Sequence, residues 1–322
     1  MISRFAYLVL WILLCSCCAL KHVPHDAWMQ QFKPHDHQTL AKAMWMDTLD
    51  QEWTKYFDDC EQWYTHLPPS IEFSRMVYHS DGLQVHAILG KSKEITIPAP
   101  AIIYNRGGNR GIGMLNVCEL KNLFYPLIQK GYVVVGSQYR GNDGGEGKEE
   151  FGGADVNDVI HLHRWLSTQK FVDRKNIFMM GGSRGAMMSM LAIRKGLAVN
   201  AVATRSGLFD LRDAPYDESP FGKMLWDKVF TELIPNIDTQ QKQVLLDRSP
   251  IVWADEIKTP TLIIQGVLDN RLDKDQAIKM HKALKDHGTD TKLILYEDDH
   301  RLSHHLPEAI DQIDQWFHQY RK

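Results

Sequence analysis

The sequence lacks the features that would assign it to several other classes of protein. Its net charge is only −3, so nothing in the composition calls for a nucleic acid or an anionic membrane surface as a partner. It has no His-Glu-x-x-His motif and no paired Cys-x-x-Cys motifs, so a dedicated metal site is not expected. No organic cofactor is expected either. It also lacks internal repeats and low-complexity segments. Its 322 residues suit one large domain with additions, or two small domains.

A hydrophobic run long enough to span a membrane is also missing. The apolar segment from Phe5 to Leu14 is too short for this. This segment follows a weakly basic start and precedes Leu14-Cys15-Ser16-Cys17-Cys18, the pattern of a bacterial lipoprotein signal. We therefore expect residues 1–18 to direct export to the periplasm, cell envelope or medium. Cys17 is the expected lipidated residue, with Cys18 as the alternative, and the lipid would anchor the protein to a membrane. A plain cleaved signal or an uncleaved anchor is the other interpretation.

Cysteine is scarce in the rest of the chain. Of the five cysteines, only Cys60 and Cys118 lie clearly in the folded part. In an oxidising compartment they could form a disulfide, and two free buried thiols are the alternative.

Residues 19–69 are expected to form an N-terminal helical segment. Trp45, Leu49, Trp53 and Phe57 recur at intervals of four, which is typical of one helix face, and Pro68-Pro69 ends the pattern. This face is expected to pack on the main domain; a role in covering the substrate is the alternative.

From about residue 70 to the C-terminus, apolar segments typical of strands alternate with segments typical of helices. The expected strands are 73–79, 84–89, 101–105, 132–137, 176–180, 200–205, 261–265 and 292–296. The expected helices are 118–130, 154–169, 186–195, 273–287 and 307–320. This alternation predicts an α/β fold with a mostly parallel central sheet and helices on both faces. The turn Ser80-Asp81-Gly82 adds an antiparallel hairpin at one edge, and the proline-rich segment 207–258, with a helix around 222–233, is expected to be a partial lid.

A Gly-x-Ser-x-Gly motif lies at Gly181-Gly182-Ser183-Arg184-Gly185. The residues before it are typical of a buried strand, and those after it are typical of a helix. A nucleophile elbow requires this strand–turn–helix order, because the serine backbone is strained and needs small neighbours. Ser183 is therefore the expected nucleophile, and a tight or phosphate-cradling βα turn is the alternative.

A serine nucleophile needs a base and an acid that orients the base, and in this fold the acid precedes the histidine in sequence. Asp269 follows the C-terminal end of strand 261–265, at the edge where ligands bind in open α/β sheets, and is the expected acid. A solvated loop carboxylate is the alternative role for Asp269. Asp273 is the runner-up as the acid, although its position is more typical of the start of a helix.

His300 lies in the loop after the last expected strand and is the expected base. His304 and His305 compete with it but lie closer to the final helix. The acidic run Glu297-Asp298-Asp299 could raise the basicity of His300, depending on how these side chains point.

The oxyanion formed during acyl transfer needs two hydrogen-bond donors. One is expected to be the backbone N–H of Arg184, the residue after the nucleophile. The other is expected to be the backbone N–H of Arg106 or Gly107, in the glycine-rich loop after strand 101–105. A tight turn without a catalytic donor is the alternative.

Together these residues resemble the catalytic domain of the prolyl oligopeptidase family of serine peptidases, from about Phe73 to the C-terminus. Beyond the elbow, the resemblance lies in segments 139–147, 151–158 and 249–269. It implies an α/β-hydrolase fold and a peptidase that acts on short peptides. The chain departs from the family at Arg106 and Gln265, where members often have histidine. The family's β-propeller is not expected, so size filtering would fall to the N-terminal helices and segment 207–258, or be lacking.

The expected activity is hydrolysis of an amide or ester through an acyl-enzyme, with a small peptide as the substrate implied by the resemblance. A carboxylesterase acting on a carbohydrate or lipid acyl group would use the same residues and is the runner-up. A non-catalytic binding protein on a hydrolase scaffold is a lesser alternative. Acidic side chains that bind a peptide's free amino terminus would favour a peptidase, and Glu146, Glu149 and Glu150 are the candidates.

Overall fold

A computed structural model describes residues 51–322 of the chain. The export signal, the lipidation site predicted at Cys17 or Cys18, and most of the helical segment predicted over 19–69 lie outside the described residues. Within residues 51–322, no helix combines the length and the apolar character needed to cross a membrane.

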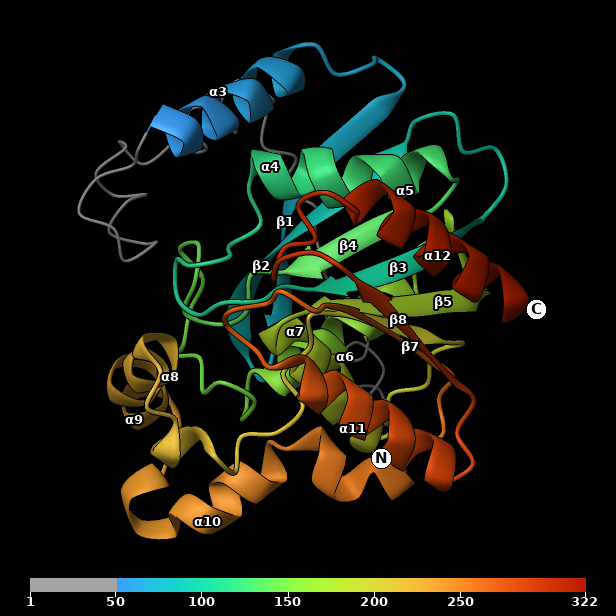
Figure 1. The fold of residues 1–322 in the computed structure, drawn as a ribbon. Coiled ribbons are helices and arrows are strands. Elements are labelled where there is room, and N and C mark those ends of the chain that lie inside the picture. Colours follow the sequence, from blue (N-terminus) through green and yellow to red (C-terminus); the bar gives the residue numbers. More distant parts are fainter. Residues whose placement is uncertain (1–50) are drawn as a thin grey trace, which may run out of the picture.

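A central sheet of eight strands organises the domain, in the order β1-β2-β4-β3-β5-β6-β7-β8 (Figure 1). Strands β3 to β8 run parallel, and β1 and β2 form an antiparallel hairpin at one edge, as the sequence predicts. The strands are β1 (Ile71–Ser80), β2 (Leu83–Ser92), β3 (Ala99–Asn105), β4 (Val133–Ser137), β5 (Val172–Gly182), β6 (Val202–Arg205), β7 (Thr261–Gly266) and β8 (Thr291–Tyr296).

The hairpin turn lies where the sequence predicts it. Ser80 pairs with Leu83, and the two residues between them, Asp81 and Gly82, both have positive φ, at 52° and 83°. Two left-handed residues twist a two-residue turn in the sense that matches the twist of the flanking strands.

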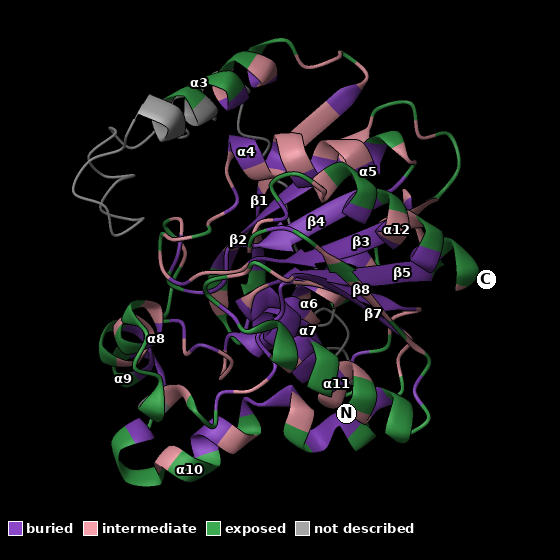
Figure 2. Cartoon of the chain, in the orientation of Figure 1, coloured by how far each residue is buried: buried purple, intermediate pink, exposed green. Residues whose placement is uncertain are grey.

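Helices cover both faces of the sheet (Figure 1). One face carries α3 (Gln51–Thr65), α4 (Val117–Glu119), the π-helical turn η1 (Leu120–Phe124), α5 (Tyr125–Gln129) and α12 (Leu306–Gln319). The opposite face carries α6 (Val156–Leu166), α7 (Arg184–Arg194) and α11 (Lys274–Asp286). The central strands are buried on both sides, which explains apolar runs without alternation such as Val133–Val135 (Figure 2).

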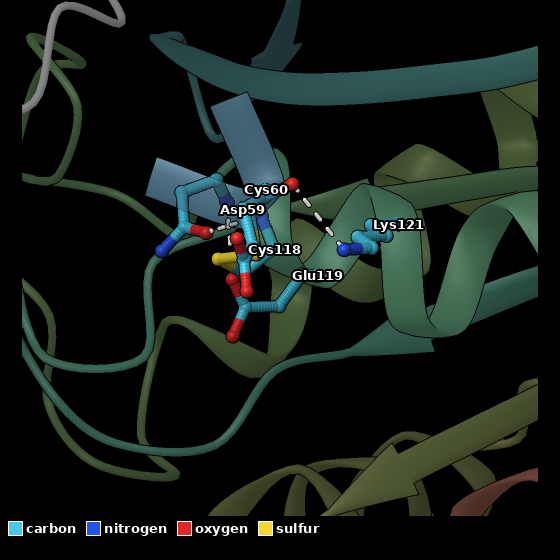
Figure 3. Close-up of a disulfide and its surroundings, with 6 residues drawn as sticks. Asp59, Cys60, Cys118, Glu119 and Lys121 are labelled. Carbon is cyan, nitrogen blue, oxygen red and sulfur yellow. Dashed lines mark hydrogen bonds between the residues drawn. A yellow bond between two sulfur atoms is a disulfide. The ribbon is translucent and has the colours of Figure 1, made fainter. Parts of the chain in front are cut away.

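A disulfide joins Cys60 of α3 to Cys118 of α4, which decides between pairing and two free thiols (Figure 3). The Lys121 ammonium also donates to the carbonyl oxygen of Asp59 at 3.3 Å. Cys60 and Tyr64 are buried, so α3 packs against the α4 side of the sheet.

The alternation of strands and helices stops between β6 and β7. The predicted helix over 222–233 is present as α8 (Pro220–Leu225), the π-helical turn η3 (Trp226–Phe230) and α9 (Thr231–Leu233). The insertion also contains two 3₁₀ segments, η2 (Ala214–Tyr216) and η4 (Pro250–Glu256), and the helix α10 (Ile237–Asp247). The sequence analysis did not predict α10, in which only three residues are buried and the backbone departs from helical geometry at Gln240.

Candidate active site

Ser183 lies at the turn between β5 and α7 with a strained backbone, at φ 53° and ψ −123°. A left-handed φ is uncommon outside glycine and marks a position that the surrounding structure must hold. Here the Ser183 N–H donates to the carbonyl oxygen of Arg205 at 2.9 Å, and its carbonyl oxygen accepts from the Leu208 N–H at 3.2 Å. The turn therefore has the conformation of a nucleophile elbow.

The two glycines that flank the elbow are required by close packing. A methyl group added at Gly185 would overlap the carbonyl oxygen of Asn105 at the end of β3, and one added at Gly181 would overlap the carbonyl of Gly185. The motif is thus needed to bring the nucleophile turn against the loop that follows β3.

Asp269 and His300, far apart in sequence, meet at the same edge of the sheet. The Nδ1 atom of His300 lies 2.7 Å from Oδ2 of Asp269. The other carboxylate oxygen of Asp269 accepts from the backbone N–H groups of Arg271 at 2.8 Å and Leu272 at 3.0 Å. Because the Asp269 side chain is fully buried, it is not a solvated loop carboxylate.

Gln265 also donates to Oδ2 of Asp269, at 3.0 Å. The sequence identified Gln265 only as a departure from the family pattern, and gave no signal that its amide would orient the acid.

Gly266 allows the two loops to meet. A methyl group at this position would overlap the carbonyl oxygens of Asp298 and Asp299, which cross the end of β7 immediately before His300. The missing side chain thereby sets the approach of the histidine loop to Asp269.

Burial and mutual attraction oppose each other in this pair. Burial raises the pKa of Asp269, but its hydrogen bond to His300, the charge of His300 and the backbone donors Leu272 and Arg271 outweigh it, so the net pKa is lowered. Burial lowers the pKa of His300, Asp269 raises it only in part, and the charges of Arg271 and Arg205 lower it further. Both shifts favour an ionised Asp269 beside a neutral His300, the protonation states that a resting acid–base pair needs.

The competing residues have structural roles. Asp273 caps α11 by accepting from the Asp275 N–H at 2.9 Å. His305 lies 3.0 Å from Asp298 through Nδ1 and stacks on the ring of Tyr296. Asp299 accepts from the Arg301 N–H at 2.8 Å. Asp298 and Asp299 thus bind the 300–305 loop, and the carboxylate that raises the pKa of His300 is Asp269.

Arg205, which the sequence did not single out, connects the nucleophile turn to the histidine loop. Its Nη1 donates to the carbonyl oxygen of Arg301, the neighbour of His300. Its Nη2 would lie 3.4 Å from a methyl group on Gly182, and the hydroxyl of Tyr104 would lie 3.5 Å from the same position. In the sequence, the position of Arg205 is marked only by a positive charge at the end of a buried strand.

The structure places Gly107 directly against the nucleophile. A methyl group on Gly107 would lie 3.1 Å from both Cβ of Ser183 and the carbonyl oxygen of Gly182. Arg184 begins α7, where the first backbone N–H groups have no partner within the helix. Arg106, Gly107 and Arg184 therefore meet beside Ser183, as an oxyanion site requires, and we keep their roles as donors as a prediction.

The acidic residues considered for a peptide's amino terminus are already engaged. Glu149 is buried and pairs with Arg184, with Oε2 2.6 Å from Nη1. Glu146 accepts from the Gln84 N–H at 2.8 Å, and Glu150 from the Ala154 N–H at 2.8 Å.

Two cavities lie near the site, and the residues that line them include neither Ser183 nor His300. One, of about 470 Å³, is lined by residues including Arg110, Lys148 and Glu232 and lies between the loop after β3 and α9. The other, of about 410 Å³, reaches Asp269 and includes Asp217 and Arg271. Among the described residues, no group of three or more His, Cys, Asp or Glu side chains is arranged to hold a metal ion.

Comparisons with known proteins agree with this geometry. The profile described as "Prolyl oligopeptidase family" matches residues 119–322. The uncharacterized peptidase YtmA of Bacillus subtilis is 26% identical over 254 residues, which cover 76% of this chain and 93% of YtmA. The human acylamino-acid-releasing enzyme is 28% identical over 205 residues, which cover 58% of this chain but only 26% of that protein.

Among solved structures, an acylaminoacyl peptidase in complex with Z-Gly-Gly-Phe-chloromethyl ketone shares the fold, with a TM-score of 0.67 and 22% identity. The match covers 81% of this chain and 43% of that one. The chain thus spans nearly all of one relative, and less than half of the other two.

Proposed function

The chain belongs to the prolyl oligopeptidase family, and from this premise we propose that it is a serine peptidase that cleaves short peptides through an acyl-enzyme at Ser183. The observation that carries the proposal is the buried Asp269–His300 pair, at the same sheet edge as the strained Ser183 turn.

In the acylation step, Oγ of Ser183 attacks the carbonyl carbon of the scissile bond while its proton passes to Nε2 of His300. The carbonyl π electrons move to oxygen, and the backbone N–H groups of Arg184 and of Gly107 or Arg106 stabilise the resulting oxyanion. The C–O⁻ electrons then re-form the carbonyl, the C–N bond breaks, and the amine leaves with the proton from His300.

In the second half of the reaction, water loses a proton to His300 and attacks the acyl-enzyme in the same way. The ester bond to Ser183 breaks, the peptide acid leaves, and the proton returns to Oγ. Throughout both steps Asp269 holds the Nδ1–H of His300 and stabilises the imidazolium form.

A peptide substrate is supported by the names of the relatives, which are peptidases, and by the peptide chloromethyl ketone in one neighbouring structure. We assign the selection of substrates by size to the insertion between β6 and β7. Arg110 of the loop after β3 pairs with Glu232 of α9 at 2.6 Å and donates to the Lys228 carbonyl at 3.0 Å, so the insertion borders the oxyanion site.

The test has two stages. First, a fluorophosphonate probe should label the wild-type chain, and Ser183→Ala should abolish labelling and lower kcat by about 10⁶-fold. No labelling of the wild type, or undiminished labelling of Ser183→Ala, would contradict the proposal. Second, kcat/KM on matched peptide amides and acyl esters of increasing size should favour short peptides. Exclusive turnover of acyl esters would identify a carboxylesterase instead.

We also propose that the protein is exported and lipidated at Cys17. The Cys60–Cys118 disulfide supports an oxidising compartment, because structural disulfides are rare in the cytosol. In bacterial cells fed labelled palmitate, the full chain should incorporate label. Cys17→Ser should abolish incorporation while Cys18→Ser keeps it, and the reverse result would reassign the lipid to Cys18.

A further inference from the structure

We infer that the side chains of Arg184 and Glu149 are positioning residues for catalysis, which hold the oxyanion loop (residues 106–112) against the nucleophile turn. The inference rests on the proposed function. The catalytic triad and the backbone donors do not involve the side chains of Arg184 and Glu149, so their positioning role is additional.

The Arg184 side chain reaches away from Ser183 into a closed environment. It is only 1% exposed, and its Nη1 donates to the carbonyl oxygen of Gly108 at 3.0 Å and to Oε2 of Glu149 at 2.6 Å. Its Nη2 donates to Oδ2 of Asp155. The guanidinium also lies 4.5 Å from the ring centre of Phe151. The residue after the nucleophile therefore binds the oxyanion loop directly.

Glu149 makes a second link between the same two segments. Its Oε1 accepts from the backbone N–H of Arg110, within the oxyanion loop, while its Oε2 accepts from Arg184. The carboxylate thus joins the loop to the first residue of the helix that follows the nucleophile. Its pKa is lowered despite burial, because Arg184 and Arg106 are close, so Glu149 is ionised at neutral pH.

Asp155 fixes the other end of this network. It accepts from the backbone N–H of Gly152 at 3.0 Å as well as from Arg184. Arg248 holds the same segment by donating to the carbonyl oxygen of Phe151 at 3.1 Å. Arg184 is therefore bonded to a segment that has further hydrogen bonds of its own, and can restrain the oxyanion loop.

The oxyanion loop is internally braced by Arg106. This side chain is fully buried and donates to the carbonyl oxygens of Gly107 at 3.1 Å, Ile112 at 3.0 Å and Arg110 at 3.1 Å. Because these bonds connect both ends of the loop through one side chain, a restraint at Gly108 and Arg110 also sets the position of Gly107 beside Ser183.

The arrangement makes Arg184 act on both sides of the oxyanion. Its backbone N–H is one expected donor, and its side chain fixes the loop that carries the other. Buried ion pairs are a poor way to gain stability alone, and within residues 51–322 Nε of Arg184 is a buried donor without a hydrogen-bond partner. The buried Arg184–Glu149 pair keeps the two oxyanion donors at a fixed separation, and apolar side chains in its place would not do so.

The test compares Arg184→Lys, Glu149→Ala and Glu149→Gln with the wild type. Arg184→Lys and Glu149→Ala should lower kcat by about 100-fold with little change in KM, since a small misplacement of catalytic groups has this effect. Glu149→Gln keeps an acceptor for Arg110 and should recover part of the loss. The acid-limb midpoint of the kcat/KM profile should stay unchanged, because Asp269 and His300 are untouched.

Arg140→Lys is the matched control. Arg140 is a similarly buried arginine, paired with Asp158 at 2.7 Å, but it holds α6 and the β1–β2 turn rather than the oxyanion loop. It should lose thermal stability and keep kcat. Thermal unfolding of every variant identifies any that fail to fold. If Arg184→Lys or Glu149→Ala does not fold, the test uses Glu149→Gln, which is the mildest change.

Two results would overturn the inference while leaving the hydrolase intact. One is a folded Arg184→Lys enzyme with kcat within about threefold of wild type. The other is an equal fall of kcat in Arg140→Lys. A wild-type chain that neither reacts with fluorophosphonate nor turns over substrate would instead contradict the proposed function.

Discussion

At the scale of single residues, the properties of His300 depend on groups that surround it in space. Burial, Arg271 and Arg205 lower its pKa, and Asp269 raises it. Catalysis requires the neutral imidazole, so kcat/KM should fall as the pH drops through the His300 pKa. The midpoint of this acid limb should lie below about 6.5, the ordinary value for histidine.

Arg271→Ala should move that midpoint upward, because it removes a positive charge that disfavours the imidazolium. The measurement is kcat/KM against pH for the variant and the wild type. Lys274→Ala is the control: Lys274 is an exposed cation that is not among the main groups shifting the His300 pKa, so its midpoint should not move. An unchanged or lower midpoint in Arg271→Ala would show that its charge does not reach His300.

Asp269→Asn should lower kcat by about 10⁴-fold, because an amide cannot hold the Nδ1–H tautomer that His300 needs. Steady-state kinetics measure the loss. Asp273→Asn is the matched control, since asparagine also caps helices and the activity should be retained. Equal losses in both variants would refute the assignment of Asp269 as the orienting acid.

At the scale of elements, the site depends on how closely the ends of neighbouring strands and loops can approach. The sequence predicted every strand of the sheet to within a few residues, because the strands are apolar and bounded by turns. The sequence also predicted the helices α6, α7, α11 and α12, because these segments too are bounded by turns. It did not predict α10, whose buried residues are few.

Gly266→Ala tests this scale directly. Its methyl group would overlap the carbonyls of Asp298 and Asp299, so the histidine loop must move away from Asp269. We expect a loss of kcat of about 100-fold in a protein that still folds. Circular dichroism establishes folding, and fluorophosphonate labelling rates report the nucleophile. Gly111→Ala, where the added methyl meets open space, should leave the unfolding midpoint unchanged. Wild-type labelling by Gly266→Ala would show that the loops can adjust.

At the scale of the whole molecule, the disulfide ties α3 to the domain that carries the site. It joins residues 58 positions apart, and closing a loop of this length is expected to stabilise the fold by roughly 4 kcal/mol. The double variant Cys60→Ala/Cys118→Ala should therefore unfold at lower denaturant concentration than the oxidised wild type. Reductant should destabilise the wild type and leave the variant unaffected. Equal stability of oxidised and reduced wild type would contradict this role.

The sequence by itself determined the order of strands and helices along the chain, the α/β class and the Gly-x-Ser-x-Gly motif. It also predicted an acid and a base, Asp269 and His300, which the structure brings together. These are local signals, since periodicity, glycine spacing and position after a strand are all read from neighbouring residues. Only the tertiary structure decided that Cys60 pairs with Cys118, that Gln265 holds Asp269, that Arg205 connects two loops, and that Glu149 binds Arg184 rather than a substrate. Each of these contacts joins side chains whose direction depends on the packing of separate elements, and hydrophobic pattern carries no information about that direction.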